Sequence, residues 1–198
     1  MKNSLFIGFA FLFLPFYAFS QASVHDPSVI FYGLDFSKAK LVGSVGFTEP
    51  QKIKDHYFKE WNNVLVAEKD KYSITRFFKK TEATYDMSVV EPRNASVKVD
   101  GLVTEAPHEI DDKDIPGMVS AYKPTQSSGL GLVFIVDSFD KLNEKAVIHV
   151  VFFDIKNKKV LRQHKMSGAP GGFGFRNYWL GAVHAIMKKA PNEAALWQ

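Results

Sequence analysis

The sequence has 198 residues, with 25 Lys and Arg against 21 Asp and Glu, a formal net charge of +4 and no cysteine. This length corresponds to one domain, and a composition of 46% hydrophobic and 23% charged residues excludes a disordered chain. A chain without cysteine has no disulfides, zinc ribbons, iron–sulfur clusters or thiol nucleophile. The small and scattered positive charge argues against nucleic acid as a partner.

The N-terminus has the layout of a secretory signal peptide. After a short positive start, Leu5 to Phe19 is almost wholly apolar and falls short of the about 20 residues that a membrane-spanning helix needs. Ala18 and Ser20 are small residues, spaced for a cut after Ser20. We expect residues 1–20 to be cleaved and residues 21–198 to form a single domain, periplasmic or extracellular, with no membrane span. A retained N-terminal anchor is the alternative.

The first part of the mature chain predicts two strands and a long helix. Residues 29–32 and 40–45 are β-rich runs. Thr48 to Gln51 has the pattern of a capping box with Pro in the first turn. Apolar residues follow at helical spacing, which predicts a helix over about 49–67.

The middle of the chain gives weaker patterns. Residues 71–80 fit a strand or an extension of the helix, and residues 85–90 alternate as a strand does. Residues 96–103 predict a weaker strand, and residues 104–114 form an acidic, loop-like run. A short helix is expected over 115–122, before a proline.

The last third predicts an antiparallel meander followed by a helix. The strands are expected over 130–136, 146–155 and 159–166. A glycine-rich run, residues 167–174, then leads into a helix over about 175–190. Together the elements predict an α+β fold: a mainly antiparallel sheet of five to seven strands with two long helices packed on it.

Three runs resemble a functionally uncharacterised family of secreted proteins from the Bacteroidota. They are GLDFSKAK from Gly33, GLGLVFIV from Gly129 and GGFGFRNYW from Gly171. The resemblance would cover most of the mature chain. It implies an exported location and no particular activity.

The C-terminal order of hairpin, glycine-rich loop and helix resembles a second group, the periplasmic assembly factors. These include the N-terminal domain of the TolB translocation protein, the curli-secretion lipoproteins and the outer-membrane activators of penicillin-binding proteins. Asp154, Val160 and Leu161 match their hairpin motif, whereas Asn157-Lys158 replaces its Thr-Gly turn. The resemblance covers about the last third of the chain and implies a role in envelope assembly.

The glycine-rich loop is the best candidate for a ligand- or partner-binding site. Glycines before a helix can turn backbone N–H groups toward an anion, and the helix dipole adds to that attraction. The loop lacks the Gly-Lys-Ser/Thr of a P-loop and the βαβ setting of a dinucleotide fingerprint. The alternative is a structural turn that packs Phe173 and Phe175 under the sheet. The candidate residues are Gly171, Gly172, Gly174, Arg176 and Asn177.

Familiar catalytic and metal-binding patterns are missing from the sequence. The six histidines are scattered without a zinc-site spacing, and we expect His149 and His184 to be packed residues. The acidic run 108–114 lacks the pattern of an EF-hand and is expected to be a solvated loop ending in a helix cap. Ser37 to Lys40 matches Ser-x-x-Lys without the partner motifs of a serine hydrolase. We expect no catalytic residue, no metal and no cofactor.

These patterns favour an exported cell-envelope interaction or assembly module without catalytic activity. Its partner would be an envelope protein or a cell-wall component, bound through a sheet edge or the glycine-rich loop. An exported hydrolase with a carboxylate pair that local spacing does not reveal, and a small-ligand-binding protein using the glycine-rich loop, are the alternatives. Two close, buried carboxylates in a cleft would favour the hydrolase, and one exposed aromatic patch the interaction module.

Overall fold

The structure, a computed structural model, describes residues 21–197, with side chains as far as Glu193. The predicted signal peptide lies outside the described residues. Seven strands form one sheet. Their bounds are β1 Ser28–Asp35, β2 Lys40–Val42, β3 Glu82–Tyr85, β4 Val103–Thr104, β5 Leu130–Asp140, β6 Lys145–Asp154 and β7 Lys159–Gly168.

The sheet is built around β5, whose two edges carry strands of opposite direction. One edge pairs in parallel with β1 along residues 131–135 and with β2 along residues 138–140. β3 and β4 extend this side, parallel to β1 and β2 respectively. The other edge of β5 pairs antiparallel with β6, and β6 pairs antiparallel with β7. The predicted C-terminal meander is therefore present.

The prediction of an α+β fold with a mainly antiparallel sheet is wrong. All four pairings made by β1 to β4 are parallel, and the fold is mixed α/β. The physical reason is the helical segment between β1 and β3, because a helical crossover lets the next strand run parallel to the first. Residues 85–90 alternate as a strand does, but β3 ends at Tyr85 and a 3-10 turn, η3 (Met87–Val89), follows.

The two long helices lie where the periodicity predicts them. The first begins with Pro50 rather than a capping box, since Glu49 is the N-cap residue and makes no side-chain cap hydrogen bond. It includes one π-helical turn. The helical bounds are α1 Pro50–Lys52, η2 Ile53–Tyr57 (the π turn), α2 Phe58–Ala67, α3 Ile74–Phe78, α4 Glu91–Ala95, α5 Ile115–Ser120 and α6 Gly174–Lys189. Further 3-10 turns are η1 Ser44–Gly46, η4 Asp112–Asp114 and η5 Ala190–Trp197.

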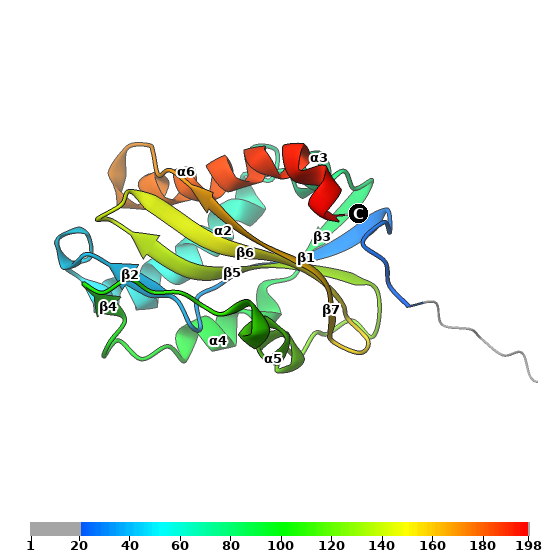
Figure 1. The fold of residues 1–198 in the computed structure, drawn as a ribbon, viewed down its shortest axis with the longest axis horizontal. Coiled ribbons are helices and arrows are strands. Elements are labelled where there is room, and N and C mark those ends of the chain that lie inside the picture. Colours follow the sequence, from blue (N-terminus) through cyan, green and yellow to red (C-terminus); the bar gives the residue numbers. More distant parts are fainter. Residues whose placement is uncertain (1–20, 198) are drawn as a thin grey trace, which may run out of the picture.

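Helices cover both faces of the sheet, so the molecule has three layers (Figure 1). α2, α3 and α6 pack over the larger core, which holds Trp61 and Trp179 in fully buried positions. The Trp179 ring stacks on Phe139 of β5 with the ring centroids 4.6 Å apart. α5 and η3 cover a smaller core on the opposite face. β6 is buried on both sides because it lies between these two cores.

The chain leaves the sheet between β1 and β2, and two buried asparagines take over the hydrogen bonding there. Asn62 of α2 accepts from Leu34 N at 2.7 Å and donates to Leu34 O at 3.1 Å. Asn94 of α4 accepts from Phe36 N at 2.7 Å and also donates to Leu34 O, at 2.9 Å. Gly33 has φ +86°, and a Cβ there would lie 2.3 Å from Asn62 Oδ1. The connector that follows, residues 36–39, is thus held in place by side chains.

Candidate functional site

The glycine-rich loop lies flat against the first turns of α6. Gly171 N donates to Tyr178 O at 2.9 Å. A Cβ on Gly181 would lie 2.0 Å from Gly171 O, so loop and helix approach as closely as two backbones can. Gly172 and Gly174 have φ +119° and +80°, which other residues rarely adopt. The geometry matches the structural alternative, in which the glycines shape the turn.

Arg176 is tied into the protein rather than aimed at an open anion site. Its Nη1 lies 2.9 Å from Glu60 Oε1 of α2, and its Nε donates to Asn177 Oδ1 at 3.2 Å. Its carbonyl oxygen accepts from Trp61 Nε1 at 3.1 Å. Asn177 in turn donates to Phe173 O at 3.1 Å. The glutamate compensates for a positive charge near a helix N-terminus, and the group joins α6 to α2.

The two phenylalanines of the loop have different environments. Phe175 packs against Phe47, Tyr57 and Trp61 in the larger core. Phe173 is 97% exposed, so the expectation that it packs under the sheet is wrong. Its position at the N-cap of α6, between two glycines with positive φ, carries the ring out into solvent.

Phe173 belongs to a cluster of exposed apolar side chains at one end of the molecule, which we call the tip. The tip comprises Phe173, Val45 of η1, which is 88% exposed, and Leu142 of the β5–β6 turn, which is 58% exposed. The three loops that carry them gather at the left end of Figure 1. Leu142 lies directly over Gly43, since a Cβ there would be 2.9 Å from Leu142 Cγ. The sequence alone does not show that these three segments meet, and it includes Val45 in the β-rich run 40–45, whereas β2 ends at Val42.

A cavity of about 300 Å³, the tip pocket, opens between these loops. One wall is formed by the Lys141 side chain, whose Nζ lies 3.0 Å from Glu144 Oε1 and 2.8 Å from the Tyr178 hydroxyl. These hydrogen bonds, first that of Tyr178 and then that of Glu144, raise the pKa of Lys141. The lining residues are Gly46, Lys141, Gly172, Gly174, Phe175, Tyr178 and Trp179. Aromatic side chains thus form part of the pocket wall, and each tip residue is a chain neighbour of a lining residue.

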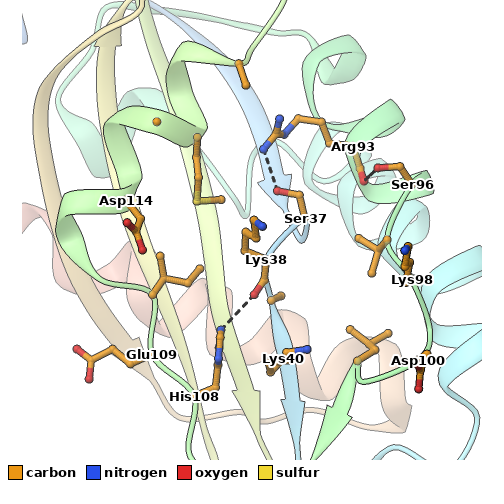
Figure 2. Close-up of a pocket in the computed structure, with 17 residues that line it drawn as sticks. Ser37, Lys38, Lys40, Arg93, Ser96, Lys98, Asp100, His108, Glu109 and Asp114 are labelled. Atoms are coloured by element: carbon orange, nitrogen blue, oxygen red, sulfur yellow. Dashed lines mark hydrogen bonds between the residues drawn. The ribbon is translucent and has the colours of Figure 1, made fainter.

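A larger cavity, of about 840 Å³, lies beside the connector between β1 and β2, and we call it the connector pocket (Figure 2). The connector, the segment after α4 and the segment around α5 form its walls. Its basic lining residues are Lys38, Lys40, Arg93, Lys98 and His108. Its acidic lining residues are Asp100, Glu109 and Asp114. Residues Ser37 to Lys40, which match Ser-x-x-Lys in the sequence, thus line this cavity.

A buried carboxylate holds Arg93 in place at this pocket. Asp35, fully buried at the end of β1, lies 3.1 Å from Arg93 Nε and accepts from the Tyr122 hydroxyl at 2.7 Å. Burial and the Asp35 charge raise the pKa of Tyr122 well above its ordinary value, so the phenol stays a donor. Arg93 Nη2 also donates to Ser37 Oγ at 3.0 Å. Asp35 and Ser37 therefore hold the Arg93 guanidinium in place without a bound ligand.

A second polar cluster lies inside the smaller core. His149, fully buried in β6, places Nε2 3.4 Å from Asp137 Oδ2 and Nδ1 3.3 Å from Asp112 Oδ1. Asp137 also accepts from Ile110 N at 2.9 Å. Burial raises the pKa of Asp137, but the hydrogen bonds of His149 and Ile110 and the charge of Lys165 together hold it below its ordinary value. These contacts attach the acidic run 108–114 to the sheet. The sequence predicts a solvated loop there and does not indicate this attachment.

The buried carboxylates do not form the acid pair of a hydrolase in a cleft. Asp35 and Asp137 are engaged as described, and neither lines the connector pocket. Asp140 accepts from Asn143 N at 2.9 Å, and Asp154 accepts from Lys156 N at 2.8 Å. These four are the buried carboxylates among the described side chains. Each one organises a turn, a loop or a neighbouring side chain.

Within residues 21–197, no group of three or more His, Asp or Glu side chains is arranged to hold a metal ion. In the same part of the chain, no helix is long and apolar enough to cross a membrane. The chain matches no protein-family model, and comparison with curated proteins and with solved structures finds no match. The two resemblances drawn from the sequence stay predictions.

Proposed function

We propose that the protein is an exported, non-catalytic interaction module of the cell envelope that binds an envelope protein at its tip. The observation that carries the proposal is the tip pocket, which has aromatic side chains in its wall and whose lining residues Gly46, Lys141 and Gly172 are followed or preceded in the chain by the exposed Val45, Leu142 and Phe173. Protein interfaces concentrate binding energy where an anchor side chain enters a desolvated pocket ringed by other contacts. An exposed aromatic ring on a tightly held loop loses little conformational freedom on binding.

The charges around the tip favour a protein over a lipid surface. Lys141 is paired with Glu144, and Arg176 is paired with Glu60. Glu105 accepts from Ser44 N at 2.7 Å, next to Val45, and adds a negative charge. Anionic membranes attract clusters of basic residues that are free of such partners. An apolar anchor with a mixed polar rim is instead the arrangement of a protein interface.

Site-specific photo-cross-linking in the native host tests the proposal. A photoreactive amino acid replaces Phe173, and the matched control carries it at Val66 of α2, an apolar residue that is 40% exposed and lies outside the tip pocket. We expect position 173 to give an adduct with one envelope protein and position 66 to give none. Adding Leu142→Asp to the position-173 variant should abolish the adduct without changing the melting temperature.

The proposal would be contradicted by an adduct that forms equally at position 66, by an adduct that survives Leu142→Asp, or by cross-linking only to lipid. An adduct of twice the protein's own mass would place a second copy on the tip and would also overturn it. Mass spectrometry of the cross-linked peptides distinguishes these cases.

A further inference from the structure

The connector pocket has the size and the place of a ligand site, and it is distinct from the tip. Its volume of about 840 Å³ falls in the range of about 300–1,000 Å³ found for small-molecule sites. It opens beside the connector that links the carboxyl end of β1 to the start of β2. We propose that this pocket binds a small zwitterion with a carboxylate and an ammonium group, such as a short peptide with free ends.

One part of the pocket is prepared for the carboxylate. Arg93, whose side chain is 23% exposed, is fixed by Asp35 and Ser37 and lies over the Tyr122 ring at 4.9 Å from its centroid. These contacts use Nε and one donor of Nη2, and Nη1 makes no hydrogen bond to any residue that the structure describes. A guanidinium fixed in this way binds a carboxylate through charge-assisted hydrogen bonds without first losing side-chain freedom.

Two lysines add unpaired positive charge beside Arg93. Lys38 and Lys98 line the pocket, and their ammonium groups have no hydrogen-bond or ion-pair partner among the described side chains. Lys40, by contrast, donates to Gly101 O and is held in the wall. A pocket wall with cations that the protein itself does not neutralise attracts an anionic group.

The acidic residues of the pocket favour a zwitterionic ligand over a polyanionic one. Figure 2 shows Asp114 and Glu109 on the wall opposite Arg93 and Lys98, with Lys38 and Lys40 between them. Like-charge repulsion from these carboxylates disfavours a nucleotide or a bisphosphate. An ammonium group at that wall would find a charge partner, and Asp114 is the acid placed to supply it, because Glu109 is already paired with Lys165 at 2.6 Å.

Isothermal titration calorimetry with L-alanyl-L-alanine and D-alanyl-D-alanine tests the inference, with the N-acetyl dipeptide, the dipeptide amide and inorganic phosphate as comparison ligands. We expect a free dipeptide to bind in the millimolar range or tighter, and phosphate and the C-terminal amide not to bind. The double variant Lys38→Glu/Lys98→Glu should weaken binding by about tenfold or more. Lys69→Glu, the same charge change at an exposed lysine outside the pocket, should leave it unchanged.

Asp114→Asn separates the two ends of the ligand. It should weaken the free dipeptide and leave the weaker binding of the N-acetyl dipeptide unaltered, because only the free dipeptide carries the ammonium group. Absence of saturable binding of either dipeptide up to about 10 mM would overturn the inference. Equal binding of phosphate, or an equal effect of Lys69→Glu, would overturn it as well. None of these results bears on cross-linking at the tip, so the two proposals fail separately.

Discussion

At the residue scale, several buried polar side chains form the hydrogen bonds to backbone groups that neighbouring strands or helical turns usually form. Asn62 and Asn94 complete the hydrogen bonding at the end of β1, beyond its pairing with β3, and Asp35 and Asp137 organise the segments above the sheet. Patterns of hydrophobicity do not reveal these roles, since each partner lies far away in the sequence. Asn94 stands in an Asn-Ala-Ser sequon, yet its side chain is buried with both amide atoms bonded.

The first prediction concerns Asn94. Asn94→Ala leaves Phe36 N without its partner and Leu34 O with one fewer, and an unsatisfied buried group costs about 1–3 kcal/mol. We expect the free energy of unfolding to fall by about 2 kcal/mol in urea denaturation. Asn63→Ala, at an exposed position next to Asn62 on α2, is the control and should change stability by less than about 0.5 kcal/mol. Equal effects of the two substitutions would show that the Asn94 bonds do not matter.

The second prediction concerns pH and Asp137. Because the pKa of this carboxyl is lower in the folded state than in the unfolded chain, its contribution to stability is present above the unfolded value of about 3.9. The contribution is lost as the pH falls through the lower, folded value. Urea unfolding between about pH 2 and pH 5 should show a steeper acid loss of stability for the native protein than for Asp137→Asn. Parallel curves for the two proteins would contradict this assignment.

At the element scale, the periodic segments and the C-terminal antiparallel meander were predictable, and the parallel direction of β1 to β4 was not. The apolar spacing of residues 49–67 and 175–190 locates both long helices, continuous apolar runs locate β5 and β6, and alternation locates β7. The parallel pairings of β3 and β4 depend on crossovers, and β4 has only two residues, too few for a pattern. The segment 71–80, open between strand and helix extension, contains the separate helix α3, capped by Ser73, whose hydroxyl accepts from Arg76 N.

The third prediction tests how the two long helices hold together. Trp179 of α6 stacks on Phe139 of β5 and on Phe47, and Trp61 of α2 donates to the backbone of α6. Replacing either tryptophan by alanine should lower the free energy of unfolding by about 3–5 kcal/mol, as deletion of a buried aromatic side chain does. Val66→Ala, on the exposed side of α2, is the control. A loss below about 1 kcal/mol at either tryptophan would place that ring outside the core.

At the scale of the whole molecule, one sheet supports two separate surfaces. The connector pocket lies where the line of β1 and β2 is broken, and the tip lies where the η1 loop, the β5–β6 turn and the glycine-rich loop meet. The sequence indicates the glycine-rich loop as a candidate, with Gly171, Gly172, Gly174, Arg176 and Asn177. It cannot indicate Val45 and Leu142, because their proximity to Phe173 depends on how the chain crosses the sheet.

The central claim is that these three loops form one docking surface, and cross-linking from each of them in turn tests it most directly. Photoreactive residues at positions 45, 142 and 173 in the native host should give an adduct with the same envelope protein, and position 66 should give none. The adducts should form while the melting temperature of each variant stays that of the parent protein. Adducts with unrelated proteins at the three positions, or a signal confined to one of them, would contradict a single docking surface at the tip.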